Sequence, residues 1–215
     1  ECGVLENPWV EPPEEAYEWT TPVSKTPDEA AIIEIAFEKG LPVALNGNKT
    51  PFHVLLAELN EIAGKHGVGR IDHVENRLVG IKSREVYEAP AAMTLIKAHQ
   101  ALESLCLTRD VAHFKVLLEQ KFANQVYEGL WYSPLLDAIN AFIDKTQETV
   151  NGVVRIKLHK GNATVIGRKS EQSLYQHVLA TYQADDQFDH KASEGFIKIW
   201  GLPLEVNAIV NKNKL

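Results

Sequence analysis

The chain is poor in sulfur-containing residues and has no long apolar run. Its 215 residues include two cysteines, Cys2 and Cys106, and a single methionine, Met93. Two cysteines so far apart in sequence argue against a disulfide framework and favour a reducing compartment. We therefore expect a cytoplasmic location, with one thiol exposed and the other packed in a helix. No run approaches the roughly 20 apolar residues of a membrane helix, so we expect no membrane partner.

Positive charge is also scarce. The chain has 22 Lys and Arg against 29 Asp and Glu, a net charge of -7. Nucleic-acid-binding proteins usually carry a basic stripe, so we expect no nucleic-acid partner. The eight histidines fall into no HxxxH or HExxH pattern, and two cysteines cannot build a structural zinc site, so we expect no metal centre.

Motifs of the common catalytic and nucleotide-binding classes are missing too. The glycine-rich run "GKHGVGR" at 64–70 lacks the GxxxxGK[ST] and GxGxxG spacings. It follows an apolar stripe with helical spacing, so we interpret it as a helix stop and tight turn. The sequence also contains no GxSxG, kinase-type or Cys/His nucleophile pattern. On motifs alone, the chain has no catalytic centre.

The first thirty residues are rich in proline and acidic residues. Five prolines exclude a continuous helix and favour extended chain. Trp9, Tyr17 and Trp19 are unusual in a disordered linker. We therefore predict an ordered, extended segment over residues 1–30. Because the chain begins with Glu1 and its methionine is internal, we expect it to be a piece of a longer polypeptide.

Apolar periodicity predicts the elements that follow. Alternation and a Lys-Gly turn predict a hairpin at 31–46, and Thr50-Pro51 predicts the N-cap and first residue of a helix. Three more helices are expected. The first carries the stripe Leu95, His99, Leu102 and Cys106, and the second carries the stripe Val111, Phe114, Leu118, Phe122 and Val126. The third is capped by Ser133-Pro134 and carries the stripe Leu135, Ile139, Phe142 and Ile143. Two strands around a second Lys-Gly turn, a polar loop at 170–194 and a strand in "GFIKIWG" complete the pattern.

This order of elements does not alternate regularly between strands and helices. It predicts an α+β fold, with a mixed, mostly antiparallel sheet, packed helices, an extended N-terminal segment and a short C-terminal arm. We expect the segment 1–30, a domain at 31–201, and a tail or arm at 202–215.

The stretch "RIDHVENRLVGIKSREVYEAP" at 70–90 combines strand-like apolar residues with charged ones. If 71–81 is one strand, Glu75 and Arg77 share a face with Ile71 and Val79. Two interpretations remain open at this point. The pair is either a solvated ion pair or part of a cleft in which the carboxylate holds a polar ligand.

Several blocks resemble those of the argininosuccinate synthase family. The string GxGR-ID-x-VENR-x-x-G-x-KSR-x-x-YE-x-P is matched at 67–90, and "ECGVLENPW", "VYEGLWYSP", "TQETVNGVVRIKLHKGNATVIGR", "SLY" and "EGFI" resemble other family blocks in order. The resemblance covers the whole chain. It implies the C-terminal synthetase domain, because the family's SGGLDTS-type loop and its aspartate-binding residues belong to an N-terminal domain that is absent here.

The resemblance implies ATP-dependent joining of citrulline and aspartate through a citrullyl-adenylate, with release of AMP and pyrophosphate. ATP with Mg2+ would bind mainly to the N-terminal domain, and the enzyme would be a cytoplasmic homotetramer. Two family citrulline-binding positions correspond to Glu75 and Tyr87. Arg77, Lys82, Ser83 and Arg84 lie in the same block, and we assign them a supporting role only. No catalytic residue and no metal ligand is expected within this chain, and the isolated chain is expected to be inactive.

One position departs from the family pattern. Glu85 stands where the family commonly has glycine. A glycine allows positive φ, which glutamate tolerates poorly, so either the backbone here is ordinary or the path to Tyr87 differs. A competing hypothesis for the chain is a stand-alone oligomerisation or amino-acid-binding module. The coding sequence upstream of Glu1 discriminates the two, through an SGGLDTS-type loop or a nearby start codon.

Overall fold

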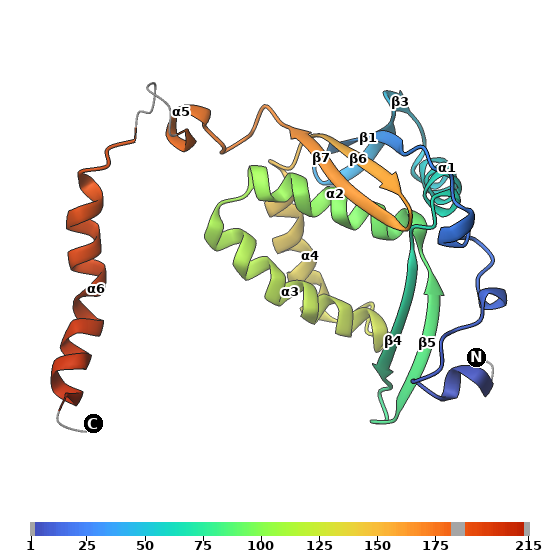
Figure 1. Ribbon diagram of the computed structural model, residues 1–215. Coiled ribbons are helices and arrows are strands. Elements are labelled where there is room, and N and C mark those ends of the chain that lie inside the picture. The colour runs from blue at the N-terminus through green and yellow to red at the C-terminus, as the bar shows by residue number, and fades with distance from the viewer. Residues whose placement is uncertain (1–2, 182–187, 213–215) are drawn as a thin grey trace. The chain divides into compact units, whose positions relative to one another are not determined.

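The computed structural model describes residues 3–181 and 188–212. The chain divides into two compact units, Glu1–Leu174 and Tyr175–Leu215. The first unit contains a five-stranded antiparallel sheet, a separate two-stranded hairpin and four long helices (Figure 1). The predicted α+β class, with a mostly antiparallel sheet and packed helices, is confirmed.

Two hairpins and a short edge strand form the main sheet. Its strands, in spatial order, are β3 (Asn48–Lys49), β2 (Leu41–Leu45), β1 (Ala31–Glu38), β6 (Gly152–His159) and β7 (Asn162–Lys169). The predicted Lys-Gly turns are confirmed at Lys39-Gly40 and Lys160-Gly161, where all four residues have positive φ. Positive φ at both central residues is what a two-residue hairpin turn requires.

Helices α1 (Phe52–Lys65) and α2 (Pro90–Cys106) bury the apolar side of this sheet. Ile35, Val154 and Ile156 of the strands pack in one core with Leu59 and Leu102 of the helices. The predicted stop after α1 is confirmed, with Gly67 at φ 73. The predicted N-cap is one residue out: α1 begins after Pro51, whose carbonyl accepts from the Leu55 amide, and Thr50 lies outside the helix.

Helices α3 (Arg109–Tyr127) and α4 (Pro134–Gln147) pack against each other. The Ser133 cap is confirmed, since its hydroxyl accepts from the Leu136 amide. The apolar stripe of α3 is less buried than its spacing suggests, with Phe114 51% exposed. The buried residues of α3 are instead polar, Lys115 and Gln125. Each has a partner, because Lys115 pairs with Glu103 of α2 and Gln125 accepts from Ser133.

The stretch 71–81 is not one strand. Strand β4 (Arg70–Asn76) ends there, and β5 (Lys82–Glu88) returns antiparallel to it. A turn separates them, closed by donation from the Arg77 amide to the Ile81 carbonyl and from the Gly80 amide to the Arg77 carbonyl. The apolar residues that suggested a continuous strand are at the exposed tip, where Leu78 is 72% and Val79 77% exposed.

The N-terminal segment runs alongside this hairpin in Figure 1. It is broken by three short 3-10 helices, η1 (Gly3–Glu6), η2 (Glu14–Ala16) and η3 (Val23–Lys25). Leu5 is buried. Trp9, one of the three aromatic residues on which the prediction of order was based, is 94% exposed and therefore does not anchor the segment to the domain. Cys2 lies outside the described residues, whereas Cys106 is buried in α2, as predicted.

The second unit contains α5 (His177–Ala180) and α6 (Ala192–Asn211). The predicted strand in "GFIKIWG" is wrong, because residues 195–201 lie inside α6. None of the residues of α6 is buried in this chain. The predicted loop at 170–194 is wrong at two places, because it contains α5 and because α6 begins at Ala192. Residues 182–187 of that loop and residues 213–215 of the predicted tail lie outside the described residues. Among the described helices, none is long and apolar enough to cross a membrane.

Candidate functional site

The β4–β5 hairpin carries two different sets of side chains on its two faces. Its register places Glu75 opposite Ser83, His73 opposite Glu85, and Ile71 opposite Tyr87. Because side chains alternate along a strand, these six residues share one face. The other face carries Arg70, Asp72, Arg84 and Glu88. Each face has its own function in the fold.

Glu75 lies at the centre of the first face. Its Oε1 accepts from the Ser83 hydroxyl at 3.4 Å, and its Oε2 accepts from the Tyr87 phenol at 3.5 Å. The Nε2 atom of His73 lies 3.7 Å from the same Oε2. The Glu75 side chain is 21% exposed. Its carboxylate is thus surrounded by polar groups at long distances, which leaves both oxygens able to accept a shorter bond from a ligand.

Tyr87 extends this face towards α3. Partial burial, followed by the negative charges of Glu75 and Glu85, raises the pKa of the Tyr87 phenol. A phenol is protonated at neutral pH even without this shift, so Tyr87 is available as a donor. The His73 ring meets the Tyr87 ring edge-on, with centroids 5.5 Å apart.

A pocket of about 440 Å³ opens over these residues. Its walls come from three elements, namely β4, β5 and α3, with the turn between the strands. The lining residues are Glu75, Arg77, Leu78, Val79, Glu85, Tyr87 and Tyr127. The two residues that the family resemblance selected, Glu75 and Tyr87, thus lie in the same pocket. This pocket is open to solvent, since Leu78, Val79 and Tyr127 are all exposed, and its carboxylates and phenols suit a ligand that donates several hydrogen bonds.

Glu85 does not disturb the path to Tyr87. It lies in the regular part of β5, paired with His73, and it is not among the residues with positive φ. Its carboxylate accepts from Nη2 of Arg77 at 3.2 Å. Of the two alternatives that the sequence left open, the structure therefore has the ordinary backbone.

The four residues assigned a supporting role divide between the two faces and the tip. Arg77 donates from Nε to the Ser83 hydroxyl at 3.0 Å, beside Glu75. Lys82 donates to the Asn76 side chain at 2.6 Å, at the end of the ladder. Arg84 faces away from Glu75 and donates twice to Asp72, at 2.6 and 2.9 Å.

Arg84 also holds the N-terminal segment. Its Nη1 donates to the backbone carbonyls of Asn7 and Val10, at 3.0 and 2.8 Å. The Arg84 side chain is only 7% exposed, and its planar guanidinium suits several acceptors at once. The second face of the hairpin is therefore a docking surface for the segment that precedes the sheet.

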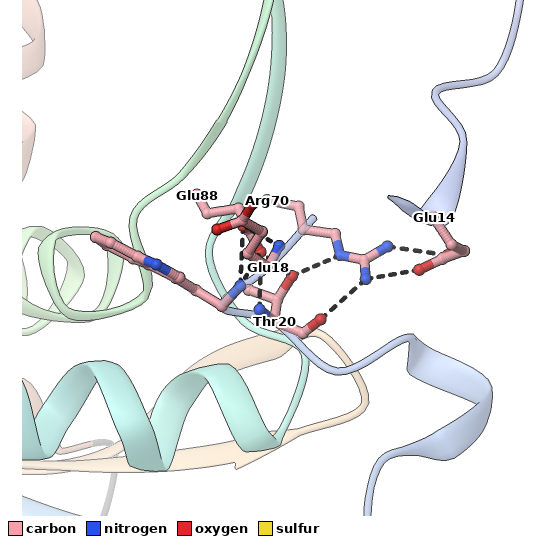
Figure 2. A network of polar contacts seen from close by, with 6 residues as sticks. Glu14, Glu18, Thr20, Arg70 and Glu88 are labelled. Carbon is pink, nitrogen blue, oxygen red and sulfur yellow. Dashed lines mark hydrogen bonds and ion pairs between the residues drawn. The ribbon is translucent and has the colours of Figure 1, made fainter. Parts of the chain in front are cut away.

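Figure 2 shows a second attachment at the base of the hairpin. The Glu88 carboxylate accepts from the backbone amides of Glu18, Trp19 and Thr20, at 2.6 to 3.1 Å. It also accepts from the Thr20 hydroxyl at 2.6 Å. Its cross-strand partner Arg70 donates to that hydroxyl at 2.8 Å, and its guanidinium reaches Glu14.

These bonds favour the ionised form of the Glu88 carboxyl group. Burial raises the pKa of its carboxyl group, but the hydrogen bonds from Thr20, Trp19 and Glu18 outweigh burial and leave the pKa below its ordinary value. Sequence reasoning missed this residue. The available signal was the pairing of two charged residues, Arg70 and Glu88, at the two ends of the block that contains Glu75.

Comparisons with known proteins identify the family to which this chain belongs. The model of the Arginosuccinate synthase C-terminal domain matches residues 1–207. The chain belongs to this family. It is 65% identical over 212 residues to argininosuccinate synthase of Halalkalibacterium halodurans, with 99% of this chain and 52% of that protein covered. It is 61% identical over 214 residues to argininosuccinate synthase of Bacillus subtilis, with 100% and 53% covered.

The chain thus spans about half the length of the curated argininosuccinate synthases that it matches. The matched range 1–207 contains the β4–β5 hairpin, and with it both Glu75 and Tyr87. Among the described residues, no group of three or more His, Cys, Asp and Glu side chains lies close enough to hold a metal ion.

Proposed function

We propose that this chain is the C-terminal synthetase domain of an argininosuccinate synthase and that it binds citrulline at Glu75 and Tyr87. The observation that supports this most directly is the convergence of these two side chains on one pocket of about 440 Å³. The whole enzyme would join citrulline to aspartate at the expense of ATP, through a citrullyl-adenylate, in arginine biosynthesis.

The chemistry of the pocket fits a citrulline molecule. The Glu75 carboxylate accepts from the ligand's ammonium group or from a ureido N–H, and charge-assisted bonds of this kind are the stronger ones. The Tyr87 phenol donates or accepts beside it. Neither residue needs to exchange a proton with the substrate. Their contribution is to hold the ureido oxygen where it can attack the α-phosphorus of ATP.

The remaining substrates belong mainly outside this chain. ATP with Mg2+ and aspartate would be bound by the N-terminal nucleotide-binding domain, since the sequence has no glycine-rich phosphate loop. The assembled enzyme would be a cytoplasmic homotetramer. We therefore expect the isolated 215-residue chain to form no argininosuccinate when supplied with citrulline, aspartate, ATP and Mg2+. Measurable argininosuccinate from the pure chain would contradict the assignment of ATP and aspartate binding to the N-terminal domain.

Glu75→Gln and Tyr87→Phe test the citrulline site in the full enzyme. Glu75→Gln keeps the shape but removes the charge, and we expect the citrulline KM to rise about 10- to 100-fold, as for loss of a charged hydrogen bond. Tyr87→Phe removes one neutral hydrogen bond, and we expect a rise of about threefold to tenfold. The KM for aspartate stays unchanged in both variants.

Glu38→Gln is the matched control, because Glu38 is an exposed glutamate on the main sheet that pairs with Lys49. We expect it to leave all kinetic constants unchanged. A citrulline KM that stays at the wild-type value in both Glu75→Gln and Tyr87→Phe would return Glu75 to the status of a solvated surface carboxylate.

A further inference from the structure

A chain of three side chains ends at Glu75. Arg77 Nη2 donates to Glu85 Oε1 at 3.2 Å, and Arg77 Nε donates to the Ser83 hydroxyl oxygen at 3.0 Å. That hydroxyl in turn donates to Glu75 Oε1 at 3.4 Å. Ser83 is also the cross-strand partner of Glu75, so the backbone ladder fixes the two side chains next to each other.

The direction of these bonds follows from the inventory of donors. A serine hydroxyl has one hydrogen to donate, and arginine can only donate. Because the Arg77 Nε–H occupies an acceptor position of Ser83, the hydroxyl hydrogen is directed to another acceptor. The Glu75 carboxylate is that acceptor. Glu85 completes the chain by fixing the Arg77 guanidinium, whose flat fork can bind two acceptors at once.

We propose that Ser83 is a positioning residue for Glu75, oriented by Arg77 and Glu85, and that it sets the affinity of the site for citrulline. The proposal rests on the proposed function of Glu75. The Ser83 contact with Oε1 is long, at 3.4 Å, so it biases the orientation of the carboxylate without saturating Oε1, and Oε2 faces the Tyr87 phenol at 3.5 Å.

Ser83→Ala in the full enzyme tests the proposal. We expect the citrulline KM to rise about three- to tenfold, with kcat, the aspartate KM and the unfolding midpoint unchanged. Ser83→Thr keeps the hydroxyl and is expected to retain near wild-type citrulline kinetics. Arg77→Lys keeps the positive charge but has no Nε–H and no fork, and we expect it to resemble Ser83→Ala.

A double-mutant cycle separates positioning from a general structural role. If Ser83 acts through Glu75, adding Ser83→Ala to Glu75→Ala raises the citrulline KM less than twofold further. Equal effects in both backgrounds, or equal rises in the KM of every substrate with a lowered unfolding midpoint, would overturn the proposal. If Glu75→Ala raises the citrulline KM and Ser83→Ala does not, only the positioning proposal fails. If Glu75→Ala has no effect, the proposed function fails with it.

Discussion

Replacing Glu88 with alanine is expected to lower the free energy of unfolding of this chain by about 2 to 4 kcal/mol. The substitution removes the acceptor of four donors, namely the amides of Glu18, Trp19 and Thr20 and the Thr20 hydroxyl. It also leaves Arg70 without its cross-strand carboxylate. We expect residues 14–20 to detach from the base of the hairpin, so the amides of residues 18–20 should exchange with solvent faster than in the wild type.

The pKa of Glu88 adds a dependence on pH. Since the folded state lowers this pKa below its ordinary value of 4.5, the folded state holds the proton more weakly than the unfolded chain. The stabilisation by Glu88 is therefore complete above about pH 4.5 and is lost as the pH falls through the lower, folded-state pKa. Urea unfolding of the wild type and of Glu88→Ala from pH 7 to pH 3 measures this pH dependence.

The difference between the two proteins should shrink in acid. Glu38→Gln serves as the control at each pH, because its carboxylate makes an exposed ion pair that is expected to contribute little. A difference between wild type and Glu88→Ala that stays constant down to pH 3, or amides of residues 18–20 that exchange at the wild-type rate, would contradict this account of the attachment.

Gly69→Ala is expected to be at least as damaging, at about 3 kcal/mol or more. Gly69 has a φ of 116, and an added Cβ would lie 2.5 Å from the backbone nitrogen and Cα of Pro90. Neither atom can move without shifting the start of α2, since the Ala89 amide donates to the Gly69 carbonyl at 2.8 Å. The junction between the hairpin and α2 therefore requires glycine at this position.

Gly47→Ala is the matched control. Gly47 also has positive φ, at 82, but an added Cβ there meets nothing within 4 Å. Its cost of about 1 kcal/mol measures the backbone conformation alone. The excess in Gly69→Ala then measures the clash with Pro90 together with the less accessible φ of 116. Equal unfolding midpoints for the two variants in urea would show that the junction adapts, and that the close approach is not required.

Local patterns predicted most of the first unit. The hairpin at 31–46 and the strands around Lys160-Gly161 were predictable because two-residue turns need positive φ and the flanking apolar residues alternate. Helices α2 and α4 were predictable because Leu95 and Leu102 in the first, and Ile139 in the second, belong to apolar stripes with helical spacing and are buried in the structure. Such patterns work where one side of an element faces the core.

The errors occur where apolar residues face solvent. The tip residues Leu78, Val79 and Ile81 look like part of a strand, yet they are exposed in a turn. Residues 195–201 are rich in aromatic and β-branched residues, which favour strands, but they lie in α6 without a buried side chain. In both places, composition without a core does not determine the element.

The site was predictable only in part. Glu75 and Tyr87 were selected by family resemblance, because a strand pattern alone could not distinguish a cleft from a solvated face. The contribution of Tyr127 to the pocket wall depends on where α3 ends against the hairpin, and the role of Glu88 depends on a segment about 70 residues away in sequence. The charged residues Arg70 and Glu88 at the ends of the block were a signal that this region is held by ion pairs, but no local pattern indicates that residues 18–20 are the donors.

The most direct test of the citrulline site is a crystal structure of the full enzyme with citrulline bound. We predict density for citrulline in the pocket beside the hairpin, with a ligand nitrogen within hydrogen-bond distance of the Glu75 carboxylate and a ligand polar atom within reach of the Tyr87 phenol. Citrulline bound elsewhere, with Glu75 and Tyr87 contacting only protein or solvent, would contradict the account.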